Sequence, residues 1–121
     1  MKVLLVDDSV AVRSRLAALL RELPGVEPAE AADGEAALAH LGDHETDVVV
    51  LDLHMPGRGG LEVLPEIKAR PHPPMVIVLT NHPTELHRAQ CLAQGADLFL
   101  DKAREFGRLL DVIVRPTTPR A

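Results

Sequence analysis

Short, continuous apolar runs alternate with longer amphipathic stretches along the whole chain, and we count five of each. An uninterrupted apolar run is typical of a strand buried on both faces of a parallel sheet, whereas apolar residues recurring every three or four positions predict a helix. The pattern predicts strands at 3–6, 26–31, 48–51, 75–80 and 98–100 and helices at 9–23, 34–42, 61–70, 83–94 and 104–114. Such alternation indicates an α/β fold with a parallel sheet covered on both faces.

Capping and helix-breaking residues set the expected boundaries of these elements. Asp8 is placed to cap the first helix, Gly42 to end the second and Pro83 to open the fourth. Pro28 cannot donate a hydrogen bond to a sheet ladder, which predicts that the second strand lies at a sheet edge.

Composition narrows the class of protein. The 121 residues contain no linker, so we expect one domain over 1–115 and a flexible tail over 116–121. A formal charge of −5, scattered basic residues and the absence of Trp and Tyr argue against direct nucleic-acid binding. Apolar runs are too short to span a membrane, and Asp7 and Asp8 interrupt the first one before it reaches secretory-signal length. With Cys91 as the single cysteine, we expect a cytoplasmic protein.

Polar side chains follow four of the five predicted strands, namely Asp7, Asp8, Asp52, Thr80 and Lys102. Right-handed crossovers bring the carboxyl ends of parallel strands to one edge of the sheet, where ligands bind. Two carboxylates about 4 Å apart repel by roughly 4 kcal/mol at an effective dielectric near 20. One lysine cannot neutralise three carboxylates, so the cluster predicts a hard divalent cation such as Mg²⁺.

Four motifs together resemble the receiver domain of two-component response regulators, and the resemblance covers nearly the whole chain. They are the pair Asp7-Asp8, the segment 52–60 that begins Asp-Leu-His-Met-Pro-Gly, the single residue Thr80, and the segment 96–102. The resemblance implies a flavodoxin-like, doubly wound sheet in strand order 2-1-3-4-5 with five helices. It also implies that Asp52 accepts a phosphoryl group from a histidine kinase or a histidine phosphotransfer protein.

The same resemblance assigns the surrounding roles. Mg²⁺ would be held by Asp8, Asp52 and the backbone carbonyl of His54, with Asp7 acting largely through a bound water. Thr80 and Lys102 would hold phosphoryl oxygens, and Thr80 and Phe99 would form the switch. A downstream protein would bind the face made by the fourth helix, fifth strand and fifth helix, and the chain would be a monomer or a phosphorylation-dependent dimer.

Two departures from the family pattern bear on the site. Ala103 follows Lys102 where receivers usually carry a proline after a cis bond, so we expect a trans bond or local strain. Asn81 is larger than the usual small residue and could narrow access to the acceptor. We hypothesise that His54, two positions after Asp52, and His82, two positions after Thr80, tune the lifetime of the aspartyl phosphate.

We expect a stand-alone receiver, because the chain ends soon after its fifth helix. Other functions compete with this interpretation. A pseudo-receiver that binds partners without phosphorylation is suggested by Ala103 and Asn81. A Mg²⁺-dependent phosphatase of the haloacid-dehalogenase type would carry two acids separated by one residue and a cap domain, so we expect no enzyme activity beyond phosphorylation and dephosphorylation of the chain itself. A zinc site at His40 and His44 is not favoured, since Gly42 is expected to end their helix.

Overall fold

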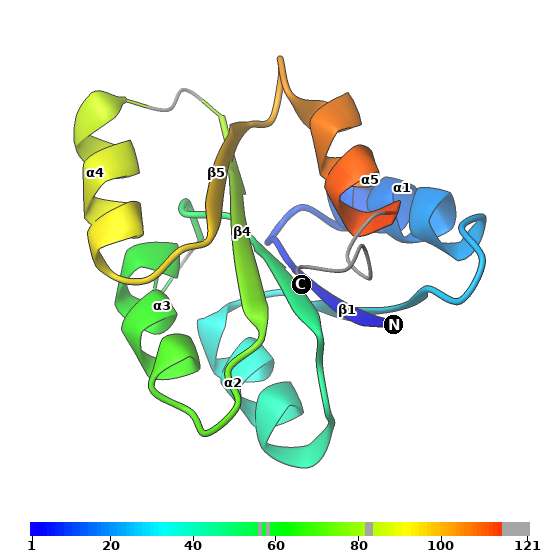
Figure 1. Ribbon diagram of the computed structural model, residues 1–121, viewed down its shortest axis with the longest axis horizontal. Coiled ribbons are helices and arrows are strands. Elements are labelled where there is room, and N and C mark those ends of the chain that lie inside the picture. Colours follow the sequence, from blue (N-terminus) through cyan, green and yellow to red (C-terminus); the bar gives the residue numbers. More distant parts are fainter. Residues whose placement is uncertain (56, 58, 82–83, 115–121) are drawn as a thin grey trace, which may run out of the picture.

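The computed structural model describes residues 1–55, 57, 59–81 and 84–114. Five parallel strands form one sheet in the order β2-β1-β3-β4-β5, and five helices connect or follow them, which confirms the expected fold (Figure 1). The elements are β1 (Lys2–Val6), α1 (Val10–Arg21), β2 (Glu27–Ala31), α2 (Gly34–Asp43), β3 (Val48–Leu51), α3 (Gly60–Lys68), β4 (Met75–Thr80), α4 (Glu85–Ala93), β5 (Leu98–Asp101) and α5 (Phe106–Val114).

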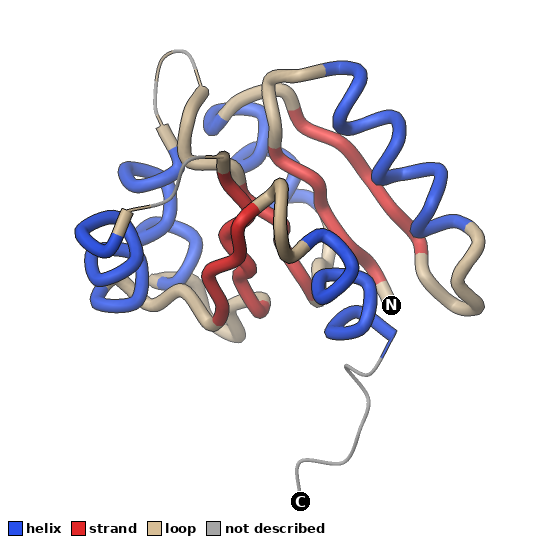
Figure 2. The backbone as a smooth tube through the Cα atoms, turned by 90° about the horizontal axis from the view of Figure 1, so that it is seen from above, coloured by secondary structure: helices blue, strands red, loops and turns tan. Residues whose placement is uncertain are grey.

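Helices cover both faces of the sheet (Figures 1 and 2). Successive side chains of a strand point to opposite faces, so the apolar run of β3 supplies Val49 and Leu51 to one core and Val48 and Val50 to the other. The first core packs against α2, α3 and α4, and the second against α1 and α5. Burial on both sides is the reason that the inner strands are continuously apolar.

The N-terminus of α1 differs from the prediction. Ser9, not Asp8, is the capping residue, because its Oγ accepts a hydrogen bond of 3.2 Å from the backbone N–H of Val12. Asp8 lies one position too early to reach the first turn, and its side chain is exposed. The cap prediction for Asp8 is therefore wrong, and this carboxylate is free for another role.

The end of α2 lies one residue beyond the predicted one. The helix continues through Gly42 to Asp43, and the N–H of His44 donates to the carbonyl of His40 at 2.9 Å. Leu41 is buried in the core next to Gly42, and this packing outweighs the roughly 1 kcal/mol by which glycine is a poorer helix former than alanine. The helix therefore ends one residue after Gly42, close to the expected end, and His44 already has extended backbone.

The remaining boundaries lie close to the expected ones. Pro28 is on β2 at the edge of the sheet, as predicted. Thr84 caps α4, since its Oγ1 accepts the N–H of His87 at 3.1 Å, whereas Pro83 lies outside the described residues. α5 begins at Phe106, two residues later than predicted, and the expected tail at 116–121 also lies outside the described residues. Among the helices that the structure describes, none has the length and apolar character needed to cross a membrane.

Candidate functional site

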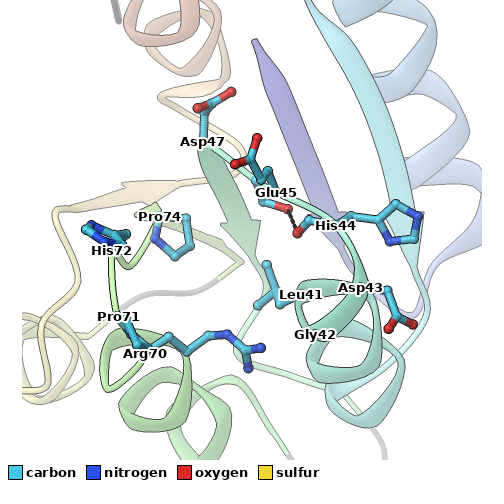
Figure 3. A pocket seen from close by; sticks show the side chains of 11 residues that line it. Leu41, Gly42, Asp43, His44, Glu45, Asp47, Arg70, Pro71, His72 and Pro74 are labelled. Carbon is cyan, nitrogen blue, oxygen red and sulfur yellow. Dashed lines mark hydrogen bonds between the residues drawn. The ribbon is translucent and has the colours of Figure 1, made fainter.

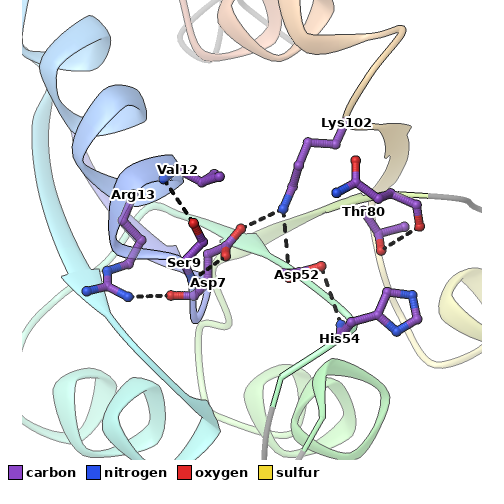
Figure 4. A network of polar contacts seen from close by, with 9 residues as sticks. Asp7, Ser9, Val12, Arg13, Asp52, His54, Thr80 and Lys102 are labelled. Carbon is purple, nitrogen blue, oxygen red and sulfur yellow. Dashed lines mark hydrogen bonds and ion pairs between the residues drawn. The ribbon is translucent and has the colours of Figure 1, made fainter.

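Three carboxylates meet at the carboxyl edge of the sheet, beside the point where the chain order reverses between β1 and β3. Asp7 and Asp8 follow β1, and Asp52 follows β3. Figure 4 shows Asp7 and Asp52 close to Lys102. One oxygen from each of the three carboxylates lies within 4.8 Å of those of the other two. Parallel pairing of Val6 with Leu51 places these strand ends side by side, so residues 45 positions apart become neighbours.

Asp7 is held from three directions. Its side chain is buried, with Oδ1 accepting the N–H of Ser9 at 2.9 Å and Oδ2 accepting the Nζ of Lys102 at 2.7 Å. Its backbone carbonyl accepts the Nη1 of Arg13 at 2.6 Å, and Arg13 pairs with Glu30 at 3.2 Å. Both carboxylate oxygens of Asp7 are therefore engaged by protein donors.

Asp52 is also buried but has weaker partners. Its Oδ1 lies 3.4 Å from the backbone N–H of His54, and its Oδ2 lies 3.8 Å from Lys102 Nζ. Burial raises the pKa of Asp52, Lys102 opposes that change, and the charge of Asp7 adds to it. The carboxylate of Asp8 is exposed, so a ligand can approach the cluster from the Asp8 side.

Thr80 and Lys102 close the other side of the site. The Thr80 hydroxyl is fully buried and donates to the carbonyl of Asn81 across 3.4 Å. The backbone N–H of Lys102 donates to the carbonyl of Thr80 at 2.8 Å, which ties the ends of β4 and β5 together. The Lys102–Ala103 peptide bond is trans, one of the two expected outcomes. Asp101 Oδ1 accepts the N–H of Ala103 at 2.9 Å and so holds this turn.

Phe99 lies on β5, on the same sheet face as Thr80. Val78 of β4 pairs with Phe99 of β5, and Thr80 pairs with Asp101 two residues further along. Because side chains alternate between the two faces along a strand, both pairs lie on the same face of the sheet. The ring is buried in the core against α4, and it borders a cavity of about 410 Å³ between α4 and the start of α5.

The histidines near the site behave differently from one another. His54 is exposed, and its ring meets the ring of His87 on α4 edge to face at 5.9 Å. His82 lies outside the described residues. Sequence reasoning missed His87 and also Arg13 and Ser9, although the preference of serine for helix caps was a usable signal for Ser9.

A separate groove of about 580 Å³ opens at the opposite edge of the sheet, between the segment after α2 and the segment after α3 (Figure 3). Arg70 and His72 line one side, and Asp43 and Glu45 line the other. None of the predicted site residues that the structure describes borders this groove. The candidate chemistry therefore belongs to the acidic edge and not to this hollow.

Comparison with known proteins shows the family of the chain. The family model described as "Response regulator receiver domain" matches residues 3–114. A protein-glutamate methylesterase/protein-glutamine glutaminase of Anaeromyxobacter dehalogenans is 40% identical over 116 residues, covering 90% of this chain and 34% of that protein. The sensory transduction protein RegX3 of Mycobacterium bovis is 36% identical over 116 residues, covering 93% of this chain and 50% of that protein. The chain thus spans between a third and a half of these relatives.

Solved structures agree with this assignment. The chemotaxis protein CheY4 of Vibrio cholerae superposes with a TM-score of 0.86 at 30% identity, covering 94% of this chain and 96% of that one. The response regulator TrrA of Thermotoga maritima, solved in complex with Mg²⁺-BeF, superposes with a TM-score of 0.80 at 33% identity, covering 93% and 95%. This chain belongs to the response regulator receiver domains of two-component systems.

Proposed function

We propose that the chain is a phosphoacceptor switch in which Asp52 takes a phosphoryl group from the phosphohistidine of a histidine kinase or a histidine phosphotransfer protein. The observation that carries this proposal is the environment of Asp52. It is a buried carboxylate with a lysine Nζ at 3.8 Å and two further carboxylates within 4.8 Å. A strand end without a chemical role would have no need of such a concentration of like charge.

The acidic cluster fits a magnesium ion. Among the residues that the structure describes, three carboxylates face one ammonium, so negative charge is left uncompensated, and oxygen ligands suit a hard cation. Because both oxygens of Asp7 already accept hydrogen bonds, Asp8 and Asp52 would bind the ion with the backbone carbonyl of His54, and Asp7 would act through water. When bound, Mg²⁺ neutralises charge on the phosphoryl oxygens.

Phosphoryl transfer asks little covalent chemistry of the protein. An Asp52 oxygen forms a bond to phosphorus while the P–N bond of the phosphohistidine breaks, and the departing imidazole keeps that electron pair and takes up a proton. Lys102 favours the ionised form of Asp52, which is the nucleophile, by opposing the rise in its pKa that burial causes, and lies close enough to bind a phosphoryl oxygen afterwards. Positioning and charge neutralisation therefore account for the reaction.

The product would pull Thr80 inward. Its hydroxyl makes only a 3.4 Å contact with the carbonyl of Asn81, so little is lost when it turns to a phosphoryl oxygen. Charge-assisted hydrogen bonds contribute about 1.5 to 3 kcal/mol each, and two of them, from Thr80 and Lys102, approach the roughly 5.5 kcal/mol that reverses a 1:99 equilibrium. Phe99 would then fill the vacated space and alter the face formed by α4, β5 and α5.

The remaining roles extend this proposal. A downstream protein binds the face of α4, β5 and α5, and the chain makes no direct contact with nucleic acid or membrane. The receiver unit covers residues 1–115, works in the cytoplasm and is a monomer or a phosphorylation-dependent dimer. His54 and His82 tune the lifetime of the aspartyl phosphate, and unchanged decay rates in both His54→Ala and His82→Ala would refute that role.

The test is intact mass spectrometry after incubation with Mg²⁺ and phosphoramidate, whose P–N bond mimics phosphohistidine. We expect the wild type to gain one phosphoryl group, Asp52→Asn to gain none, and the exposed α5 variant Asp111→Asn to match the wild type. A wild type that gains no mass when a chelator replaces Mg²⁺ during the incubation would support the metal requirement. A phosphoryl group on Asp52→Asn, or none on a wild type shown to bind Mg²⁺, would overturn the proposal and favour a pseudo-receiver.

A further inference from the structure

The turn between β5 and α5 carries Lys102 and is closed by hydrogen bonds on both sides of that residue. The backbone N–H of Glu105 donates to the carbonyl of Asp101 at 2.8 Å, which closes a single helix-like turn. Within it, the N–H of Ala103 donates to Oδ1 of Asp101 at 2.9 Å. Lys102 therefore lies inside a closed turn that begins at Asp101 and ends at Glu105.

The side chain of Glu105 returns to the sheet and closes the turn a second time. β5 is the last strand of the sheet, and the N–H of Lys102 already donates to the carbonyl of Thr80 on β4 at 2.8 Å. Because successive N–H groups of a strand point to opposite sides, the N–H of Asp101 faces the outer edge of the sheet. Glu105 Oε1 accepts this N–H at 3.0 Å. The contact links the start of α5 to the end of β5.

The position of this turn decides where the ammonium group of Lys102 lies. Its Nζ donates to Asp7 at 2.7 Å and is 3.8 Å from Asp52, and Figure 4 shows the side chain directed at both carboxylates. A lysine head group sits on a flexible stem of four carbons, so its location depends on the backbone from which the stem starts. Ala103 follows Lys102 where receivers usually carry a proline, and alanine does not fix the backbone as a proline ring does.

We propose that Asp101 and Glu105 are positioning residues for phosphoryl transfer, and that they act through Lys102. The inference rests on the proposed phosphoacceptor function of Asp52. The hydrogen bonds of the two carboxylates restrain the turn in place of the proline and so hold the lysine stem toward the acidic cluster. Without them the turn would loosen, and Lys102 would spend less time where it can neutralise a phosphoryl oxygen.

Glu105 has a second partner, whose effect has to be separated from that of the turn. Its Oε2 pairs with Nη1 of Arg108 at 3.1 Å, one turn further along α5. The Arg108 side chain is 60% exposed, and exposed ion pairs contribute little to stability. Glutamine at position 105 keeps an oxygen that can accept the N–H of Asp101 but loses the ion pair, whereas alanine loses both. Arg108→Gln loses the ion pair alone.

The test is the rate of phosphorylation by phosphoramidate at saturating Mg²⁺, followed by intact mass spectrometry. We expect Glu105→Ala and Asp101→Ala to react about ten- to a hundredfold more slowly than the wild type. Glu105→Gln and Asp101→Asn keep the acceptor oxygens, so their rates should stay within about threefold of the wild type, as should that of Arg108→Gln. Mg²⁺ should bind the alanine variants no more weakly than the wild type, because neither residue belongs to the proposed ligands. General damage to the fold would instead weaken Mg²⁺ binding as well.

Amide hydrogen exchange reports on the turn itself. The N–H of Asp101 should exchange slowly in the wild type and in Glu105→Gln, and faster in Glu105→Ala. Equal phosphorylation rates in the wild type and both alanine variants would overturn the inference and leave the proposed function intact. Losses in Glu105→Gln as large as those in Glu105→Ala would also overturn it. A wild type that binds Mg²⁺ but gains no phosphoryl group would overturn the proposed function, and this inference with it.

Discussion

The two buried carboxylates of the acidic cluster should respond oppositely to the same isosteric change. We expect Asp52→Asn to raise the free energy of unfolding at pH 7 without metal, and Asp7→Asn to lower it. Both side chains are buried to a similar degree, so burial alone does not distinguish them. The difference lies in their partners, since Asp7 makes two short hydrogen bonds and Asp52 makes long contacts.

For Asp52 the two main charge interactions nearly cancel. At an effective dielectric of about 20, Lys102 at 3.8 Å attracts the carboxylate by about 4 kcal/mol, and Asp7, no farther than 4.8 Å away, repels it by about 3.5 kcal/mol. Burial, the largest cause of the raised pKa of Asp52, then decides the sign. Asparagine keeps the shape and removes the charge, while Lys102 stays paired with Asp7 at 2.7 Å, so we expect a gain of about 1 kcal/mol.

For Asp7 the substitution breaks an interaction that nothing replaces. An asparagine has one acceptor oxygen, so it can satisfy either the N–H of Ser9 or the Nζ of Lys102 while its amide group faces the other donor. Loss of a charge-assisted hydrogen bond lowers the free energy of unfolding by about 1.5 to 3 kcal/mol. The two variants should therefore differ from each other by at least about 2 kcal/mol.

The assay is urea unfolding of the wild type and both variants in a chelating buffer, repeated from pH 7 down to pH 4. Because the folded-state pKa of Asp52 lies above its unfolded value, the stability that wild-type Asp52 contributes is present at low pH and lost as the pH rises through the folded pKa. The advantage of Asp52→Asn should thus be largest at pH 7 and shrink on acidification. A change of the same sign in both variants, or a constant advantage across this range, would refute the reasoning.

Three further outcomes are expected. In Gly60→Ala the new Cβ would lie 2.5 Å from the backbone carbonyl oxygen of Asp52, so the free energy of unfolding should fall by about 1 to 3 kcal/mol. In Gly107→Ala the new Cβ would meet no neighbouring element within 4 Å, so the free energy of unfolding should rise by about 0.4 to 1 kcal/mol. Urea unfolding of both variants, run in parallel, compares them. Burial raises the pKa of the Cys91 thiol to about 11, so labelling by a thiol reagent at pH 8 should be slow until urea unfolds the chain. Asp97→Asn, which weakens contacts to Lys68 at 2.9 Å and to the N–H of Val76 at 2.8 Å, should lower the thermal midpoint by a few degrees, measured by circular dichroism.

Whereas the strand order came from the resemblance to receivers, local pattern was enough to predict the α/β class and the strand positions, because strands buried on both faces must be continuously apolar, as β3 and β4 are. It was also enough to place Asp52, Thr80 and Lys102 at one edge, since parallel strands bring their carboxyl ends together. The resemblance to receivers supplied a role for each of these residues. These inferences depend on the order of residue types along the chain and not on the exact packing.

Tertiary packing decided which of two adjacent carboxylates is buried. Asp7 and Asp8 are equivalent in the sequence, yet Asp7 pairs with Lys102, which lies 95 positions away, and Asp8 is exposed. Such pairing depends on the relative placement of β1 and β5, on opposite sides of the inner strands, and no local pattern encodes it.

Tertiary packing also decided where α2 ends and which histidine rings touch, and local sequence pattern does not encode either feature. Leu41 packs in the core beside Gly42, so α2 runs to Asp43, one residue past the glycine, and the rings of His40 and His44 stack across the helix end. Local propensities differ by about 1 kcal/mol or less per residue, and burial of a leucine contributes about 1.5 to 3 kcal/mol, so packing prevails where the two disagree. The chain's own pattern determined where its elements lie, and the packing of those elements decided which side chains meet.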